Sequence, residues 1–269
     1  MEIEVRGVKF QVDDNKDGPA FFILGVRKSG SSMLNRVAQL LSRYNGYKFV
    51  DVAGSLFSNN VRVGEWIKDR SFGDILRPGN VYGGFRNCPL GAQENDMFVG
   101  GKKVLLVRDP RDALVSEYFS NAYSHSLPEA QGVVTEEGGA REGLLRERQK
   151  ALATTIDEYV ISRAKMMGRT LNEYMPLIDD DNLVLLKYET IIFAKEAMIG
   201  RMVRHFGWQA KPKQLEAILR WVDVRPEKED PQQFIRKVTP GDHKDKLQKA
   251  TIARLNRDLR DVLEKLEYI

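Results

Sequence analysis

Apolar residues occur along the chain in short runs that alternate with segments of helical periodicity. The continuous runs predict buried strands over 20–25, 47–52, 103–107 and 182–188. Apolar residues three and four positions apart predict helices over 30–43, 144–175, 190–207, 212–224 and 248–267. Strands separated by helices favour a parallel sheet with right-handed crossovers. The expected fold class is therefore α/β, with a central parallel sheet flanked by helices in three layers.

Three further segments lack this regular pattern. Residues 2–12 alternate around Gly7 and predict a hairpin or edge strand. Residues 54–101, rich in Gly, Asn and Pro, are expected to be mostly loop, and 128–143 a mobile loop or lid. At 269 residues the chain is long enough for one α/β domain, so we expect a single domain over 1–269.

Composition and charge narrow the possible partners. The net charge is +4, which suits a small polyanionic ligand. The chain has no dense stripe of Lys and Arg with interleaved aromatic residues, so we expect no binding to nucleic acid. The chain contains no run of about 18 apolar residues, so we expect no stable membrane insertion. Cys88 is the only cysteine, which fits a reducing compartment, so we expect a cytoplasmic protein. The three histidines show no metal-ligand spacing, and no metal is expected.

The segment FFILGVRKSGSSML, residues 21–34, carries the clearest chemistry. An apolar strand runs into a short loop with two glycines, and a helix follows. Free N–H groups and the positive end of the helix dipole at such a junction bind oxyanions. Lys28 adds a charge, and Ser31 and Ser32 add hydroxyls. The segment therefore predicts a phosphate-like ligand.

The position of the lysine separates two classes of phosphate loop. A P-loop NTPase carries Lys directly after its second glycine, followed by Ser or Thr. Here Gly25 and Gly30 have that separation, but Ser31 stands at the lysine position and Lys28 lies inside the loop. A nucleotide kinase or NTPase is therefore the alternative rather than the preferred interpretation.

The loop resembles the 5′-phosphosulfate loop of sulfotransferases that use 3′-phosphoadenosine 5′-phosphosulfate (PAPS), whose pattern is close to P-K-S-G-[ST]-[ST]. The GVRK opening is most similar to the heparan-sulfate and bacterial branches. The resemblance implies a P-loop-like fold. It also implies that PAPS is bound by Arg27, Lys28, Ser29, Gly30, Ser31 and Ser32.

A second segment, VLLVRDPRDALVSEYF, supports the resemblance. Arg108 follows a buried strand, and Ser116 lies about two turns into the next helix. An arginine and a hydroxyl that converge on one oxyanion form a phosphate clamp. The pair resembles the family's 3′-phosphate motif. The alternative is that Arg108 pairs with Asp112 at the helix start.

Two other elements match in order. Arg236 and Lys237, followed by Gly241-Asp242, resemble the cytosolic R-K-G and G-D-W-K-N loop, which closes on the 3′-phosphate. Val238 replaces the glycine and His243 the tryptophan. A solvated basic patch is the alternative. Tyr188 in LLKYET would lie near the adenine by resemblance. Met33 replaces the tryptophan that stacks on adenine in cytosolic members.

The implied reaction is sulfuryl transfer by in-line displacement to an acceptor hydroxyl, with adenosine 3′,5′-bisphosphate (PAP) as product. Lys28 would stabilise the charge on the leaving oxygen. The general base is less clear, because YGGFRN, residues 82–87, lacks the histidine of cytosolic members. Asp51 is the first candidate, with His125 and Glu94 behind it, although Asp51 suits a turn equally well.

The acceptor itself carries no motif. Its pocket is expected from 54–100 and 120–145, and a glycan, a lipid or a small metabolite would fit. A non-catalytic PAP-binding module is a further alternative, and the oligomeric state is open.

Overall fold

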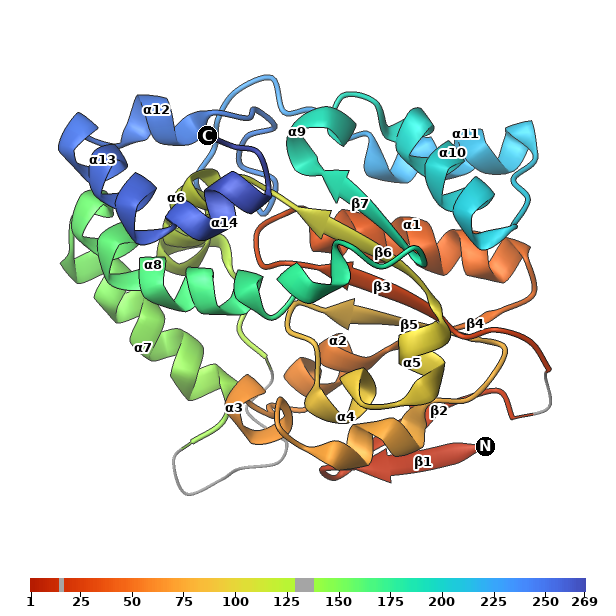
Figure 1. Ribbon diagram of the computed structural model, residues 1–269. Coiled ribbons are helices and arrows are strands. Elements are labelled where there is room, and N and C mark those ends of the chain that lie inside the picture. The colour runs from red at the N-terminus through yellow and green to blue at the C-terminus, as the bar shows by residue number, and fades with distance from the viewer. Residues whose placement is uncertain (15–16, 129–137) are drawn as a thin grey trace.

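The computed structural model describes residues 1–14, 17–128 and 138–269. Within these ranges, five parallel strands form one sheet in the order β4-β5-β3-β6-β7 (Figure 1). The strands are β3 (Phe21–Gly25), β4 (Lys48–Asp51), β5 (Asn80–Phe85), β6 (Lys102–Val107) and β7 (Leu183–Lys187). The predicted α/β fold with a central parallel sheet is confirmed. Because β3 has β5 on one side and β6 on the other, the strand order reverses beside the glycine loop, where ligands bind in such sheets.

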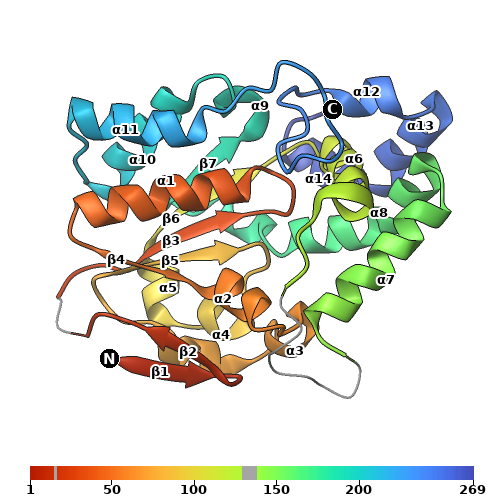
Figure 2. The same ribbon diagram turned by 180° about the vertical axis from the view of Figure 1, so that it is seen from behind.

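Helices cover both faces of the sheet (Figures 1 and 2). One face packs against α1 (Ser31–Tyr44), α10 (Lys195–Phe206) and α11 (Pro212–Val222). The other packs against α8 (Ile156–Asn172), α13 (Lys249–Asp258) and α14 (Arg260–Lys265), among others. The helix predicted over 144–175 is two helices, α7 (Ala140–Ala153) and α8, because Thr155 caps a new helix start by accepting from the N–H of Glu158.

Short elements complete the chain. The predicted hairpin is β1 (Glu2–Val5) and β2 (Val8–Gln11), paired antiparallel. The remaining helices are α2 (Val52–Ser58), α3 (Val63–Trp66), η1 (Arg70–Ile75), α4 (Leu90–Gln93), α5 (Asp96–Gly100), α6 (Pro110–Phe119), η2 (Ser120–Ser124), η3 (Met175–Leu177), α9 (Tyr188–Ile191) and α12 (Asp242–Lys246). Most of the lid predicted over 128–143 lies outside the described residues.

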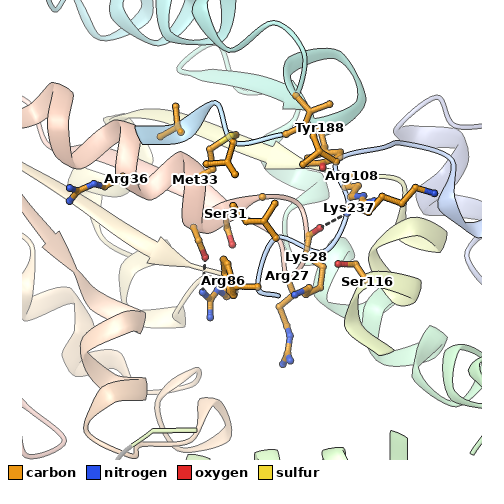
Figure 3. Close-up of a pocket in the computed structure, with 18 of the residues that line it drawn as sticks. Arg27, Lys28, Ser31, Met33, Arg36, Arg86, Arg108, Ser116, Tyr188 and Lys237 are labelled. Carbon is orange, nitrogen blue, oxygen red and sulfur yellow. Dashed lines mark hydrogen bonds between the residues drawn. The ribbon is translucent and has the colours of Figure 1, made fainter. Parts of the chain in front are cut away.

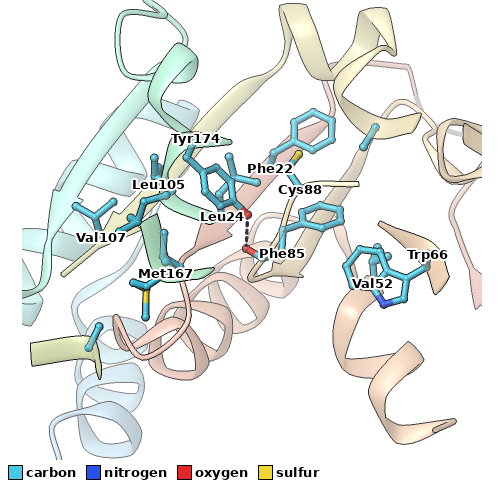
Figure 4. Packing of buried hydrophobic residues seen from close by; sticks show 14 of the residues in the cluster. Phe22, Leu24, Val52, Trp66, Phe85, Cys88, Leu105, Val107, Met167 and Tyr174 are labelled. Atoms are coloured by element: carbon cyan, nitrogen blue, oxygen red, sulfur yellow. Dashed lines mark hydrogen bonds between the residues drawn. The ribbon is translucent and has the colours of Figure 1, made fainter. Parts of the chain in front are cut away.

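The pleat of β3 divides the core in two. Phe21 and Ile23 belong to the cluster beneath α1, whereas Phe22 and Leu24 belong to the cluster on the opposite face. This alternation is what a strand buried on both faces requires. Figure 4 shows the second cluster, in which the Tyr174 hydroxyl donates to the carbonyl oxygen of Phe85 at 3.1 Å.

Strand β5 is the main departure from the sequence prediction, which assigned 54–101 to loops. Its glycines, which lower strand propensity, are needed for close approach of neighbouring groups. A Cβ on Gly83 would lie 2.4 Å from the ring of Phe49, and one on Gly84 would lie 2.1 Å from an oxygen of Asp51. The prediction was wrong here because tertiary contacts, not local periodicity, select these residues.

Candidate active site

The loop between β3 and α1 curls tightly around its own backbone. The Ser29 hydroxyl donates to the carbonyl oxygen of Val26 at 2.6 Å, and the Ser29 N–H donates to the same oxygen at 3.1 Å. Gly30 adopts φ 92°, and a Cβ on Gly25 would lie 2.7 Å from the Cβ of Ser31. Both glycines are therefore required for the loop to close, and α1 begins at Ser31, with its N-terminus at the cavity.

Lys28 occupies an unusual position within the loop. Its φ of 62° lies in the left-handed region, which is uncommon for residues other than glycine. Burial of its ammonium group, with further repulsion from Arg86 and Arg27, lowers its pKa to about 7. A cation held in such an environment is stabilised by an incoming anion.

Arg108 lies at the end of β6 and is 7% exposed. Its guanidinium stacks over the ring of Tyr188 at 4.4 Å, and Nη1 donates to the carbonyl oxygen of Lys28 at 3.4 Å. Nη2 lies 3.7 Å from Asp112, so the alternative pairing exists only as a long contact. The buried Nε has no hydrogen-bond partner among the described residues. The guanidinium therefore retains donor capacity for a ligand.

The start of α6 explains how Arg108 is presented. Asp109 accepts from the N–H of Arg111 at 2.9 Å, and Pro110 occupies the first helical position. These are the N-cap and N1 preferences of helices. Ser116 on this helix lines the same cavity as Arg108, as the sequence predicted.

One cavity of about 320 Å³ is lined by most of the predicted binding residues (Figure 3). They are Arg27, Lys28, Gly30, Ser31, Ser32, Arg108, Ser116, Tyr188 and Lys237. Ser29 does not line it, because its hydroxyl is turned back onto the loop. We refer to this as the nucleotide cavity. In Figure 3, Met33 and Arg36 lie toward one end, and Ser116 and Lys237 toward the other.

An aromatic side chain that the sequence did not indicate lies at the Met33 end. Trp221 at the end of α11 lines the nucleotide cavity while its side chain is 67% exposed. The guanidinium of Arg36 lies 5.3 Å from its ring centroid. An exposed tryptophan and a methionine that line the same cavity offer a flat apolar surface to a ligand.

The two residues of the predicted basic pair, Arg236 and Lys237, make different contacts. Arg236 forms ion pairs with Glu229 and Asp242, stacks over Phe119 at 4.2 Å and does not line the cavity. Lys237 lines the cavity while its ammonium lies 2.9 Å from Asp242. The structure thus brings Lys237, but not Arg236, together with the loop.

Arg86 is a site residue that sequence reasoning missed. It follows β5, lines the nucleotide cavity and donates to the Ser32 hydroxyl at 3.4 Å. Burial and the neighbouring charge of Arg27 lower its pKa. An arginine directly after a strand was the available signal, but the strand itself was not recognised.

Two of the three candidate bases lie outside the nucleotide cavity. Asp51 is exposed and caps α2 by accepting from the N–H of Gly54 at 3.0 Å. Glu94 is exposed and pairs with Arg70 at 2.9 Å. Neither residue lines the cavity.

His125 does line the nucleotide cavity. Its Nδ1 lies 2.9 Å from the carbonyl oxygen of Ser126, which can only accept, so Nδ1 carries the proton and Nε2 carries the lone pair. Burial lowers its pKa to about 4; the Ser126 contact opposes this, and nearby Lys28, Arg27 and Arg86 reinforce it. His125 is therefore neutral at pH 7.

Two kinds of feature are absent from the described part of the chain. No group of three or more His, Cys, Asp or Glu in the described ranges is arranged to hold a metal ion. In the same ranges, no helix is both long and apolar enough to cross a membrane.

Comparison with protein families gives one match over most of the chain. A family model described as sulfotransferase domain matches residues 19–267. No curated protein sequence matches the chain.

Solved structures show the same fold at low sequence identity. The crystal structure of mouse sulfotransferase SULT7A1 complexed with PAP is 13% identical, with 97% of this chain and 94% of that chain covered and a TM-score of 0.59. Retinol dehydratase in complex with androsterone and inactive cofactor PAP is 15% identical, with 91% and 80% covered and a TM-score of 0.50.

Proposed function

The chain belongs to the sulfotransferase family, and we propose that it uses Lys28 to transfer the sulfuryl group of PAPS to an acceptor hydroxyl. The carrying observation is the convergence of Lys28, Arg108 and Lys237 on one cavity at the end of the sheet. The acceptor is proposed to be a small molecule, a carbohydrate or a lipid. A single domain over 1–269 and a cytoplasmic location stay predictions.

The cavity suits a ligand with two phosphate groups. The loop N–H groups and α1 N-terminus provide one anion site, for the 5′-phosphosulfate. Arg108 and Ser116, with Lys237 beside them, provide a second, for the 3′-phosphate. Among the described residues, the buried Nε of Arg108 has no hydrogen-bond partner, which supports this assignment, because buried donors in folded proteins are normally satisfied.

We place the adenine at the other end of the cavity. There Met33 and the exposed ring of Trp221 provide apolar surface. Tyr188 is less available, because Arg108 covers one face of its ring and Gly30 lies against it.

Bound PAPS supplies an activated sulfuryl group on a good leaving group. Lys28 then has one task, to stabilise negative charge that develops on the oxygen leaving sulfur. Arg86 and Arg27, on the same side of the loop, add positive charge around the transferred group. When the anionic ligand is bound, its negative charge offsets the repulsion among these cations. The pKa of Lys28 therefore rises above its value of about 7 in the free protein.

For the general base we propose His125 rather than Asp51. His125 lines the cavity and carries a lone pair on Nε2, which has no hydrogen-bond partner in the described ranges, whereas the Asp51 carboxylate caps a helix. The anionic ligand offsets the repulsion by Lys28, Arg27 and Arg86, which raises the basicity of His125 when it is needed.

Two measurements test the proposal. PAP without metal should raise the melting temperature, whereas Mg-ATP should not; the reverse result would favour the kinase alternative. Transfer of ³⁵S from labelled PAPS to a mixed set of alcohols should then be detectable. PAP binding with no transfer to any acceptor would favour the non-catalytic module.

A further inference from the structure

A second cavity of about 370 Å³ adjoins the nucleotide cavity. The two share four lining residues, Arg27, Arg86, Asn121 and His125. An occupant of the second cavity would therefore meet the proposed base and the loop cations. We propose that it binds the acceptor, and that the acceptor is an alcohol or phenol with an apolar body and an anionic substituent. This inference rests on the proposed function.

One wall of the second cavity is apolar, which indicates that the acceptor has an apolar body. Phe57, Trp66 and Leu144 line the second cavity but not the nucleotide cavity. The ring of Phe57 lies 5.7 Å from that of His125, between centroids. An apolar body against this wall would hold a hydroxyl group next to the imidazole.

The anionic part is indicated by the charge of the lining. Five arginines line the second cavity: Arg27, Arg62, Arg86, Arg146 and Arg163. Three carboxylates neutralise part of this charge. Glu65 pairs with Arg62 at 2.9 Å, Glu147 with Arg163 at 3.3 Å, and Glu117 with both Arg163 at 2.7 Å and Arg27 at 3.7 Å. Among the described residues, the lining therefore keeps an excess of positive charge.

Arg146 is the residue that separates acceptor recognition from cofactor binding. It lies on α7 and lines the second cavity but not the nucleotide cavity, so the nucleotide does not account for its charge. Its side chain is exposed, and although the charge of Glu142, one turn earlier on α7, interacts with it, no carboxylate in the described ranges lies within ion-pair distance as a partner. A carboxylate, phosphate or sulfate on the acceptor would supply that partner.

Matched naphthols test the inference without knowledge of the natural acceptor. Binding of 6-hydroxy-2-naphthoate, 6-hydroxynaphthalene-2-sulfonate and neutral 6-hydroxy-2-naphthamide is followed by their fluorescence, with the full chain and saturating PAP. We expect both anions to bind about tenfold more tightly than the amide, as a charge-assisted contact implies. A preference for one anion would identify which head group the site takes.

Two variants localise the effect. Arg146→Gln should remove most of the difference between anions and amide and leave amide binding unchanged. Lys150→Gln removes the same charge one turn further along the same helix, at an exposed position that lines neither cavity, and should leave the difference intact. If Arg146→Gln does not fold, raising NaCl from about 50 to about 500 mM in the wild type should reduce anion binding but not amide binding.

The inference is overturned if the amide binds as well as the anions, if no anion binds, or if both variants reduce anion binding equally. Failure of the proposed function is a separate result. It would show as no effect of PAP on the melting temperature, and the naphthols can still be compared without PAP.

Discussion

The imidazole of His243 and the carboxylate of Asp112 meet at 2.6 Å between Nδ1 and Oδ1, although 131 positions separate them in the chain. The same carboxylate accepts from the N–H of Gly241 at 2.6 Å and of His243 at 2.9 Å. Asp112 lies in the first turn of α6, four residues after Arg108. One buried carboxylate thus attaches the loop that carries Lys237 to the helix that follows Arg108.

The contacts around Asp112 keep it ionised. Burial alone would raise its pKa, but the hydrogen bond from His243, the charge of Arg108 and the backbone N–H groups lower the pKa to about 2. The position taken by tryptophan in cytosolic sulfotransferases is therefore filled here by a histidine with a structural partner.

Asp112→Asn should weaken PAP binding about tenfold, because an amide keeps the shape but loses the charge that holds the loop. Isothermal titration with PAP measures it. Asp261→Asn, at an exposed position on α14, serves as the control. A lower melting temperature with unchanged PAP affinity would mean that the attachment stabilises the fold without positioning the site.

Lys28→Met should lower kcat about 100- to 1,000-fold, the range observed when a group that stabilises developing charge is removed. PAP affinity should fall far less, because the loop N–H groups remain. Steady-state transfer of labelled sulfate and PAP titration separate the two effects. Lys48→Met, exposed on β4, controls for the loss of one positive charge. Near-normal turnover of Lys28→Met would contradict the assigned role.

PAP binding should take up protons above about pH 7. Lys28 in the free protein loses its proton near this pH, whereas bound phosphate favours the charged form. Below about pH 7, Lys28 is protonated in both the free and the PAP-bound protein, so the affinity for PAP does not change with pH through this residue. Above about pH 7, the affinity for PAP falls as the pH rises. Phosphate is already ionised there. Titration at about pH 8 in two buffers of different ionisation enthalpy measures the uptake, and Lys28→Met should abolish it.

The sequence predicted the elements whose signal is local. Strand β3 is a run of buried apolar residues, and the Asp109-Pro110 pair marks the start of α6 directly. Strand β5 carries no such signal, because Gly83 and Gly84 leave the space that the side chains of Phe49 and Asp51 occupy. Because β5 was not predicted, Arg86 was also missed, since its only signal is that it directly follows a strand.

Side-chain pairing limited the prediction of the site in a different way. Motif spacing selected Arg236 and Lys237 as a pair, but it carries no information about Glu229, which pairs with Arg236. Nor does spacing distinguish a carboxylate that caps a helix, as Asp51 does, from one that is free to accept a proton.

Tyr174→Phe should destabilise the fold by about 1–3 kcal/mol, because it leaves the buried carbonyl oxygen of Phe85 without its 3.1 Å hydrogen bond. Figure 4 shows this contact within the core. Urea unfolding measures the change, with the more exposed Tyr44→Phe as the control. Equal stability of the two variants would mean that the hydroxyl makes no net contribution.

His125→Gln should lower kcat about 100-fold or more, the contribution of a positioned base, with little change in PAP affinity. Asp51→Asn should leave kcat within about twofold, since an amide oxygen still accepts from the N–H of Gly54. Because the His125 pKa lies near 4 in the free protein, activity measured as kcat/KM should persist to about pH 5. An acid limb near the ordinary histidine pKa of about 6.5 would contradict this environment. A large loss of kcat in Asp51→Asn alone would return the role of base to Asp51.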